Sequence, residues 1–158
     1  MAAIQKNFPN LLMVNVPVGY LCFTVFTKDL QFQVTGWESL RPYRIGFIRG
    51  VRKIEENTQG MRVEPVTKLE QAFKKLQIGR SDLVIDAPLN GMKMLNKLGF
   101  KDIRFLEPPL EREPLYHYLH TRHANLVPLL EQTLTHMEQE GVIQTIRDQV
   151  MQELLNKK

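Results

Sequence analysis

The sequence predicts an α/β protein built on an open sheet, from two observations along the chain. Between residues 43 and 106, short runs of apolar, β-branched and aromatic side chains alternate with helical patterns, with glycines and prolines between them. In the last third, one strand pattern is followed by two amphipathic helical patterns. Strands that alternate with helices form a sheet covered by helices, so we expect this architecture.

Composition restricts the function classes. The chain has 158 residues, of which 43% are hydrophobic and 24% charged, as in an ordinary globular protein. Lysine and arginine number 21 against 17 aspartate and glutamate, an excess too small to indicate a nucleic-acid partner. The single cysteine, Cys22, excludes an intramolecular disulfide and a thiolate zinc cluster. We expect it to be an inert thiol buried in an apolar strand.

The first element is an uncharged stretch from Asn7 to Thr27, long enough to cross a bilayer. Pro17 and Gly19 interrupt it, and β-forming residues dominate the rest. We therefore predict two buried strands, 11–16 and 20–27, and no membrane span. No small-residue cleavage motif follows a clean apolar core, so no signal peptide is predicted.

The remaining elements follow in order. Thr67 is expected to cap a helix with Glu70 as its reciprocal partner, and Pro88 to begin the next helix. Two final helices are expected, the first ending at Gly141. The predicted strands are 43–48, 61–64, 82–86, 103–106 and 115–120, and the predicted helices in the sheet region lie at 51–58, 67–79 and 88–99.

Several segments, in the right order, resemble the periplasmic amino-acid-binding proteins of ABC transporters. Ile45-Gly-Phe-Ile-Arg-Gly50 resembles the strand-to-helix turn that opens their second lobe. Residues 76–85, which contain Gly79-Arg80-Ser81-Asp82, are similar to their L-x-x-G-R-x-D segment with its apolar strand. Residues 114–120 are similar to their return strand, and 124–128 and 137–143 to their closing helices.

The resemblance implies an α/β fold with an open mixed sheet of the type II periplasmic-binding-protein kind. In that fold, two lobes are joined by crossing strands and the ligand lies in the cleft. We expect residues 1–27 to be a remnant of the first lobe with one crossing strand and residues 28–112 to be a complete second lobe. Residues 113–158 would supply the return strand and two C-terminal helices that pack toward the first lobe. The opening elements of the first lobe, with their carboxylate-gripping arginine, have no counterpart here.

The functional expectation is a non-enzymatic module that captures an amino acid or other small polar or anionic solute. It would be periplasmic or extracellular, would serve an ABC permease and would need no cofactor. An alternative stays open, in which a truncated or degenerate module associates with protein and binds no ligand. In that case the exposed C-terminal helices would form a homodimer. An enzyme on the same fold ranks last, because no acid, base and nucleophile converge.

The first group of candidate ligand-binding residues is Arg49, Gly50, Val51 and Arg52. Gly50 allows close backbone approach, and the N–H groups that follow can hold an anion. In the family a Ser or Thr here often contacts the ligand carboxylate, whereas Val51 has no hydroxyl. Arg49 and Arg52 would supply the charge instead. The alternative is that these arginines lie on a solvated face.

Asp86 is the other candidate. In the family, an acidic residue at the end of this strand pairs with the ligand ammonium, five residues after the aspartate matched by Asp82. Here Asp86 follows by four residues and Ala87 occupies the expected place. Because one residue of shift reverses a side chain's direction on a strand, Asp86 as the cap of the helix at Pro88 remains an alternative. Asp82 is expected to order the turn with Arg80.

No metal site is predicted from the histidines. His117 and His120 would lie on opposite faces of an extended strand, and His123 lies beyond it. Trp37 is expected to pack rather than to stack on a ligand.

Overall fold

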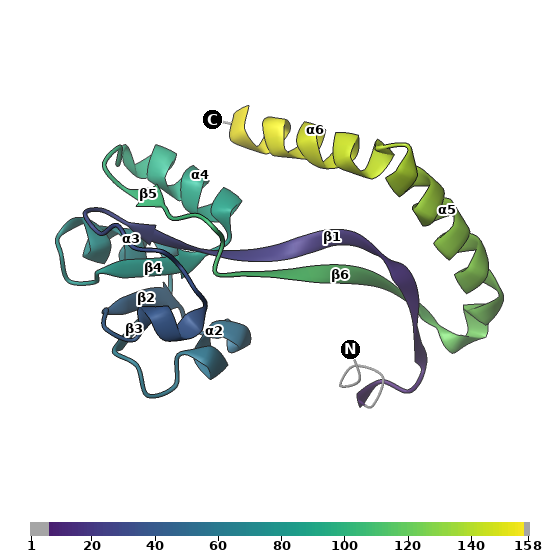
Figure 1. Cartoon of the computed structure of the whole chain (residues 1–158), viewed down its shortest axis with the longest axis horizontal. Helices are drawn as coiled ribbons and strands as arrows, with labels where there is room; N and C mark the ends of the chain where they lie inside the picture. The colour runs from purple at the N-terminus through teal and green to yellow at the C-terminus, as the bar shows by residue number, and fades with distance from the viewer. Residues whose placement is uncertain (1–6, 157–158) are drawn as a thin grey trace. The chain divides into compact units, whose positions relative to one another are not determined.

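The computed structural model describes residues 7–156. The chain divides into two compact units: unit 1 comprises residues up to 21 and from 113 onward, and unit 2 comprises residues 22–112. The assignment of 1–27, 28–112 and 113–158 to parts of two lobes stays a prediction. The elements in chain order are β1 (Leu11–Thr27), η1 (Trp37–Leu40), β2 (Ile45–Ile48), α2 (Arg52–Asn57), β3 (Val63–Val66), α3 (Leu69–Gln77), β4 (Leu83–Asp86), α4 (Pro88–Leu98), β5 (Arg104–Phe105), β6 (Glu111–His120), η2 (Thr121–Leu126), α5 (Val127–Gln139) and α6 (Val142–Asn156) (Figure 1).

The sheet is mixed and open, which confirms the predicted fold class. Its strand order is β3-β2-β4-β1-β5, and β6 also pairs with β1. Strand β2 runs parallel to β3 and β4, whereas β1 runs antiparallel to β4 and β5. The C-terminal ends of β2, β3 and β4 therefore lie at one edge of the sheet.

Two prolines make the strands differ from the prediction. Residues 11–27 form the single strand β1 rather than two strands separated at Pro17. Strand β3 continues through Pro65, which lies opposite Phe47 of β2. Proline fixes φ at a value that an extended chain accepts, and β3 is an edge strand, where a missing N–H is tolerated.

The start of α3 corrects the predicted capping pair. The Oε1 atom of Gln71, and not Glu70, accepts hydrogen bonds from the Thr67 hydroxyl and from the N–H groups of Thr67 and Lys68. Glu70 instead pairs with Lys74 one turn later, at 2.6 Å. The helix begins at Leu69, so the reciprocal position lies one residue further along than the sequence pattern indicated.

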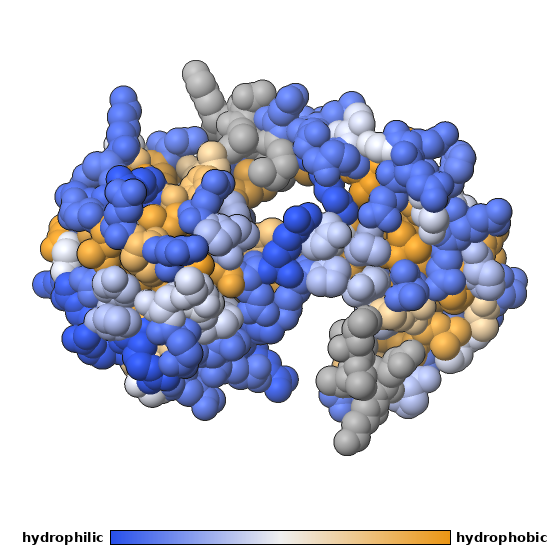
Figure 2. All heavy atoms as spheres, viewed as in Figure 1, coloured by the Kyte–Doolittle hydropathy of each residue, from blue (hydrophilic) through white to orange (hydrophobic). Residues whose placement is uncertain are grey.

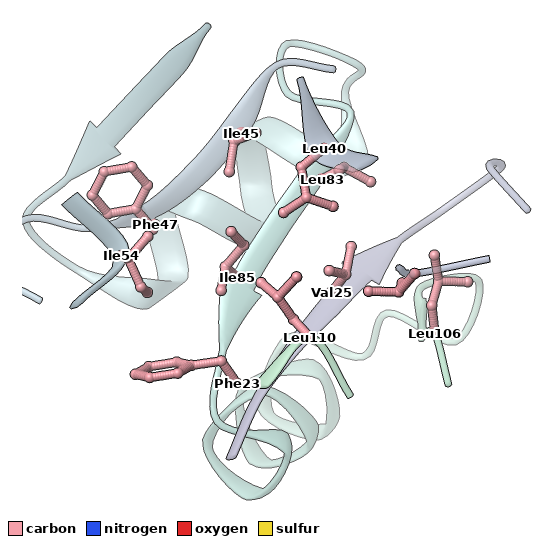
Figure 3. Packing of buried hydrophobic residues seen from close by; sticks show 11 residues of the cluster. Phe23, Val25, Leu40, Ile45, Phe47, Ile54, Leu83, Ile85, Leu106 and Leu110 are labelled. Atoms are coloured by element: carbon pink, nitrogen blue, oxygen red, sulfur yellow. The ribbon is translucent and has the colours of Figure 1, made fainter. Parts of the chain in front are cut away.

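Apolar residues from alternate positions of the strands cover both faces of the sheet. On one face, Leu83 and Ile85 pack with Ile54 of α2 and with Leu40 (Figure 3). On the other face, Val84 packs with side chains of α3 and α4. This two-sided burial explains why β4 is a continuous apolar run instead of an alternating one.

Phe26 of β1 is the centre of the second face. Its side chain is fully buried and meets the Phe73 and Phe105 rings edge-on, with centroids 5.2 and 6.0 Å away. Gly91 of α4 lies against the same ring, and a Cβ atom at this position would overlap it. The helix α4 can approach the sheet this closely because residue 91 has no side chain.

An ion pair joins the N-terminal ends of β2 and β4. The Arg44 guanidinium donates to both carboxylate oxygens of Asp82, at 3.0 and 2.6 Å, and its backbone N–H donates to the same carboxylate at 2.8 Å. These bonds hold the pKa of Asp82 below its usual value. Arg44 thus takes the role that we predicted for Arg80.

Unit 1, described by itself, has a small core. Within its described residues, only Val14, Val16 and Ile143 are buried apolar residues. Arg147 of α6 lies over the Tyr20 ring at 5.2 Å, and the Asn15 N–H donates to Glu131 at 2.8 Å.

The surroundings of Cys22 and Trp37 test two further predictions from the sequence. Cys22 is half-buried, so the prediction of a buried thiol is wrong. Trp37 packs against the first face and donates to Glu111, which confirms its packing role. Between residues 7 and 156 there is no helix whose length and apolar content would let it span a membrane.

The contact between Gly91 and Phe26 makes a stability prediction. We expect Gly91→Ala to destabilise the protein by about 2–3 kcal/mol, because overpacking a closed core forces side chains and backbone to shift. Asn96→Ala, at an exposed position of the same helix, is the control and should change stability by less than about 0.5 kcal/mol. Urea unfolding of both variants measures the difference. Equal stability of the two variants would contradict this packing.

Candidate functional site

The C-terminal ends of β2 and β4 bring most of the predicted ligand-binding residues to one edge of the sheet. Arg49 and Gly50 directly follow β2, and Asp86 is the last residue of β4. These strands are hydrogen-bonded neighbours and run parallel, so their C-terminal ends meet. Ligands of open α/β sheets bind outside the carboxyl ends of parallel strands.

The turn after β2 already holds a carboxylate. Gly50 has φ +91° and is exposed, and its N–H donates to Oε1 of Glu55 at 2.8 Å. The positive φ explains why glycine stands here, since an L side chain would be strained. Sequence reasoning missed Glu55. The only available signal was an acidic residue five positions after the glycine, in the first turn of α2.

Val51 and the two arginines have different surroundings. Val51 precedes α2 and packs, half-buried, against the first face of the sheet, so its side chain offers no polar group. Arg52 is 89% exposed and pairs with Glu56 one turn along α2, at 2.6 Å, which is the arrangement that the solvated-face alternative describes. Arg49 is exposed, and its N–H donates to the Val66 carbonyl at 2.8 Å.

Asp86 combines burial with an incompletely satisfied carboxylate. It lies opposite Thr24 of β1 and two residues after Val84, on the face that α4 covers. Burial raises the pKa of Asp86, while hydrogen bonds with the Ala87 backbone and the Asn90 side chain oppose this effect. Its Oδ2 atom is buried and has no hydrogen-bond partner among the described residues.

The contacts of Asp86 bear on both roles considered for it. Asp86 forms a hydrogen bond with the side chain of Asn90 in the first turn of α4, which supports its predicted role at the start of this helix. The capping residue itself, however, is Ala87 and not Asp86. The buried Oδ2 leaves one acceptor for a cationic or donor group. Ala87, at the place where the family has its acidic residue, offers only a methyl group.

Two depressions on unit 2 do not include the predicted ligand-binding residues, although the first reaches Val66 at the C-terminal end of β3. One, of about 500 Å³, is beside β3 and α3 and includes Lys74, Lys75 and Arg80. The other, of about 420 Å³, lies between α4 and β5. Neither contains Arg49, Gly50, Val51, Arg52 or Asp86.

His117, His120 and His123 do not form a metal site with other described residues. His117, His120 and His123 are exposed, and the His120 ring accepts the Arg122 N–H at 3.1 Å. Over residues 7–156, no group of three or more histidine, cysteine, aspartate or glutamate side chains is arranged to hold a metal ion.

Comparison with known proteins gives one sequence relative and a consistent fold. No family model matches the chain. An uncharacterized protein of Shewanella oneidensis is 28% identical over an alignment of 150 residues, and the match covers 89% of this chain and 56% of that protein. The chain thus spans a little over half of the length of this relative.

Several solved structures similar to the chain are binding proteins or their binding components. ArgBP from T. maritima, as a mutant, superposes with a TM-score of 0.59 at 16% identity, over 92% of this chain and 63% of its own. The probable amino-acid ABC transporter extracellular-binding protein of Bacillus subtilis gives 0.65 at 15% identity, over 89% and 63%. A putative binding component of an ABC transporter from Wolinella succinogenes, complexed with lysine, gives 0.65 at 14% identity, over 92% and 64%.

These structures establish the fold. The chain spans less than two thirds of the length of each of them. The chain has the fold of the type II periplasmic binding proteins, and its structural neighbours include amino-acid-binding components of ABC transporters.

Proposed function

We propose that the chain acts as a non-enzymatic solute-binding module for an amino acid or another small polar or anionic solute. The proposal rests on one observation, which is that two polar groups lie at the C-terminal ends of neighbouring strands of one sheet. The first is an amide that already binds a carboxylate. The second is a carboxylate, one oxygen of which has no hydrogen-bond partner among the described residues. The amide is that of Gly50, and the carboxylate is that of Asp86. An α-amino acid carries the two complementary groups.

The carboxylate end of the solute would bind at the turn after β2. The Gly50 N–H donates to the Glu55 carboxylate in this structure, so a solute carboxylate would have to replace Glu55 as the acceptor. Arg49, beside this amide, would add a charged donor, and charge-assisted bonds are the stronger kind. Val51 would contribute its backbone alone, and Arg52 would contribute only after leaving Glu56.

The ammonium end of the solute would pair with Asp86. A cation beside this carboxylate would compensate the burial that now raises its pKa. The neighbours from B. subtilis and W. succinogenes are extracellular-binding or binding components of ABC transporters, which supports a periplasmic or extracellular location and a permease partner for this chain.

Thermal unfolding tests the proposal. The full chain is melted with L-arginine, L-lysine, L-glutamate and small dicarboxylates, each at millimolar concentration. A solute present at a hundred times its Kd adds about 2.7 kcal/mol to the free energy of unfolding, which raises the Tm. A cooperative melt that no solute shifts would contradict solute binding.

Asp86→Asn is expected to raise stability and to lower affinity. Because burial raises the folded-state pKa above the ordinary 3.8, the ionised carboxylate opposes folding at neutral pH. This cost is absent below pH 3.8 and grows as the pH rises toward the folded-state pKa. The stability advantage of the variant should therefore be greatest at pH 7 and shrink on acidification, and its solute affinity should fall at least about tenfold.

Asp82→Asn is the matched control for Asp86→Asn. Arg44 lowers the pKa of Asp82, so its ionised form supports folding at neutral pH and this support is lost as the pH falls through the lowered pKa. The control variant should be destabilised at pH 7 and should keep its solute affinity. Urea unfolding across pH and titration calorimetry give the two readouts. If Asp86→Asn left affinity unchanged, Asp86 would have no role in binding.

Glu55→Ala is expected to tighten binding of a carboxylate solute, because the Gly50 N–H would no longer hold an internal carboxylate. Losing one exposed charge-assisted hydrogen bond corresponds to about 1 kcal/mol, or roughly a fivefold lower Kd. Glu38→Ala removes an exposed carboxylate elsewhere in unit 2 and serves as the control. Weaker binding by Glu55→Ala than by Glu38→Ala would show that the turn does not receive the solute in this way.

We propose association between copies of the chain as a second function, favoured by the distribution of apolar surface. Among the described residues, eight of the ten exposed large hydrophobic residues lie in unit 1, which holds only three of the 23 buried ones. The eight are Phe8, Val18, Leu21, Leu115, Leu126, Leu129, Ile146 and Val150. Apolar surface is visible on the side of the molecule where α5 lies (Figure 2). Surface of this kind marks interaction sites.

Light scattering tests the second function. We expect the full chain to have a mass above 18.4 kDa at micromolar concentrations, because burying this surface favours association. A protein that stays monomeric at all concentrations up to about 200 µM would contradict this proposal, because its dimer Kd would then lie well above the micromolar range.

A further inference from the structure

The chain passes between its two units at two points, one in β1 and one in β6. Unit 2 begins at Cys22 of β1 and ends at Arg112 of β6, and the two strands are paired. Trp37 of η1 contacts both strands on the unit 2 side of these points. Its ring centroid lies 6.3 Å from that of Phe23 in β1, and its indole N–H donates to Oε2 of Glu111 in β6 at 2.8 Å. One indole therefore contacts both strands where they leave unit 2.

The other oxygen of the Glu111 carboxylate contacts the helix that follows the candidate site. The Lys53 ammonium lies 2.8 Å from Oε1, and the two side chains are half-buried, with Lys53 34% and Glu111 24% exposed. Lys53 is the second residue of α2, which begins two residues after Gly50. Water screens this ion pair less than the pair of Arg52 with Glu56, in which Arg52 is 89% exposed. A single carboxylate thus joins α2 to Trp37.

Few apolar contacts hold α2 in place. It has six residues, all of them described, and only Ile54 among them is buried. A helix this short is not stable by itself, so its position depends on the groups that it contacts. Its first turn contains Glu55, which accepts the Gly50 N–H and so marks the proposed carboxylate position. A contact that holds α2 therefore also holds the group to which the solute carboxylate would bind.

We propose that Glu111 is a positioning residue for the solute site. Through Lys53 it fixes α2 and the Gly50 amide, and through Trp37 it connects this helix to the two strands that pass between the units. A solute carboxylate has to replace Glu55 at the Gly50 amide, so its binding changes the contacts of α2 and, through Glu111, the surroundings of the indole. The inference rests on the solute binding proposed above and adds the group that holds the carboxylate position in place.

Tryptophan fluorescence tests the connection, since Trp37 is the single tryptophan of the chain. L-glutamate, L-lysine and L-arginine are titrated into the full chain, and the emission and the heat of binding are recorded. We expect a saturable change of emission whose midpoint agrees with the Kd from calorimetry. Heat of binding without a change of emission would overturn this inference and leave solute binding intact. No heat of binding and no rise in Tm with any of the three would overturn the proposed solute binding, and this inference with it.

Glu111→Gln tests the positioning role. The amide oxygen of glutamine can still accept the indole N–H, whereas the negative charge that holds Lys53 is lost. We expect the solute affinity to fall at least about threefold, as for residues coupled in one network, and the change of emission at saturation to shrink. Lys53→Met removes the same ion pair from the other side, so the double variant should lose no more affinity than either single variant.

Glu64→Gln is the matched control, because Glu64 forms an ion pair of similar length with Lys75, at 2.7 Å, and the two side chains are 37% and 32% exposed. It removes a pair that does not involve α2 and should leave the affinity and the change of emission as in the wild type. A loss of affinity in Glu111→Gln no greater than in Glu64→Gln would overturn the positioning role. Losses that add up in the double variant would show that Glu111 does not act through Lys53. If Glu111→Gln does not fold, Lys53→Met compared with Lys75→Met makes the same test.

Discussion

The packing of Phe26 is the interaction on which the sheet and its helices depend. One fully buried ring on β1 contacts Phe73 of α3, Phe105 of β5 and the backbone of α4 at Gly91. Strand β1 lies between β4 and β5, so this contact fixes the position of β4 relative to the helix that follows it. The C-terminal end of β4, where Asp86 stands, is consequently positioned by a ring that is itself fully buried.

The sequence predicted the parts of the fold that depend on local chemistry. Pro88 begins α4 and Gly99, in the left-handed conformation, follows its end, as their backbone preferences dictate. The prediction was wrong where the position of a residue in the sheet determines its structure. Pro17 and Pro65 lie inside strands, because an extended chain accepts proline where no ladder N–H is needed. The capping partner of Thr67 was wrong by one residue, because the pattern Thr-x-x-Glu does not fix where the helix begins.

The candidate site shows the same division. The sequence placed Arg49, Gly50 and Asp86 at strand ends, and parallel pairing of β2 with β4 then brings those ends together. Glu55 was missed because its bond to the Gly50 amide depends on how the turn folds back on α2. The direction of Asp86 could not be predicted, since one residue of register separates a side chain under α4 from one on the other face. Its unpaired oxygen is a property of the folded surroundings alone.

Solute binding at the strand ends is the central claim, and amide chemical shifts test it most directly. The full chain, labelled with ¹⁵N, would be titrated with L-lysine, L-arginine and L-glutamate while the amide signals of unit 2 are followed. We expect the largest shifts at Gly50, Val51 and Ala87, because these amides border the proposed carboxylate and ammonium positions. Saturable shifts confined to the grooves beside α3 and α4, or no shift with any of the three, would contradict it.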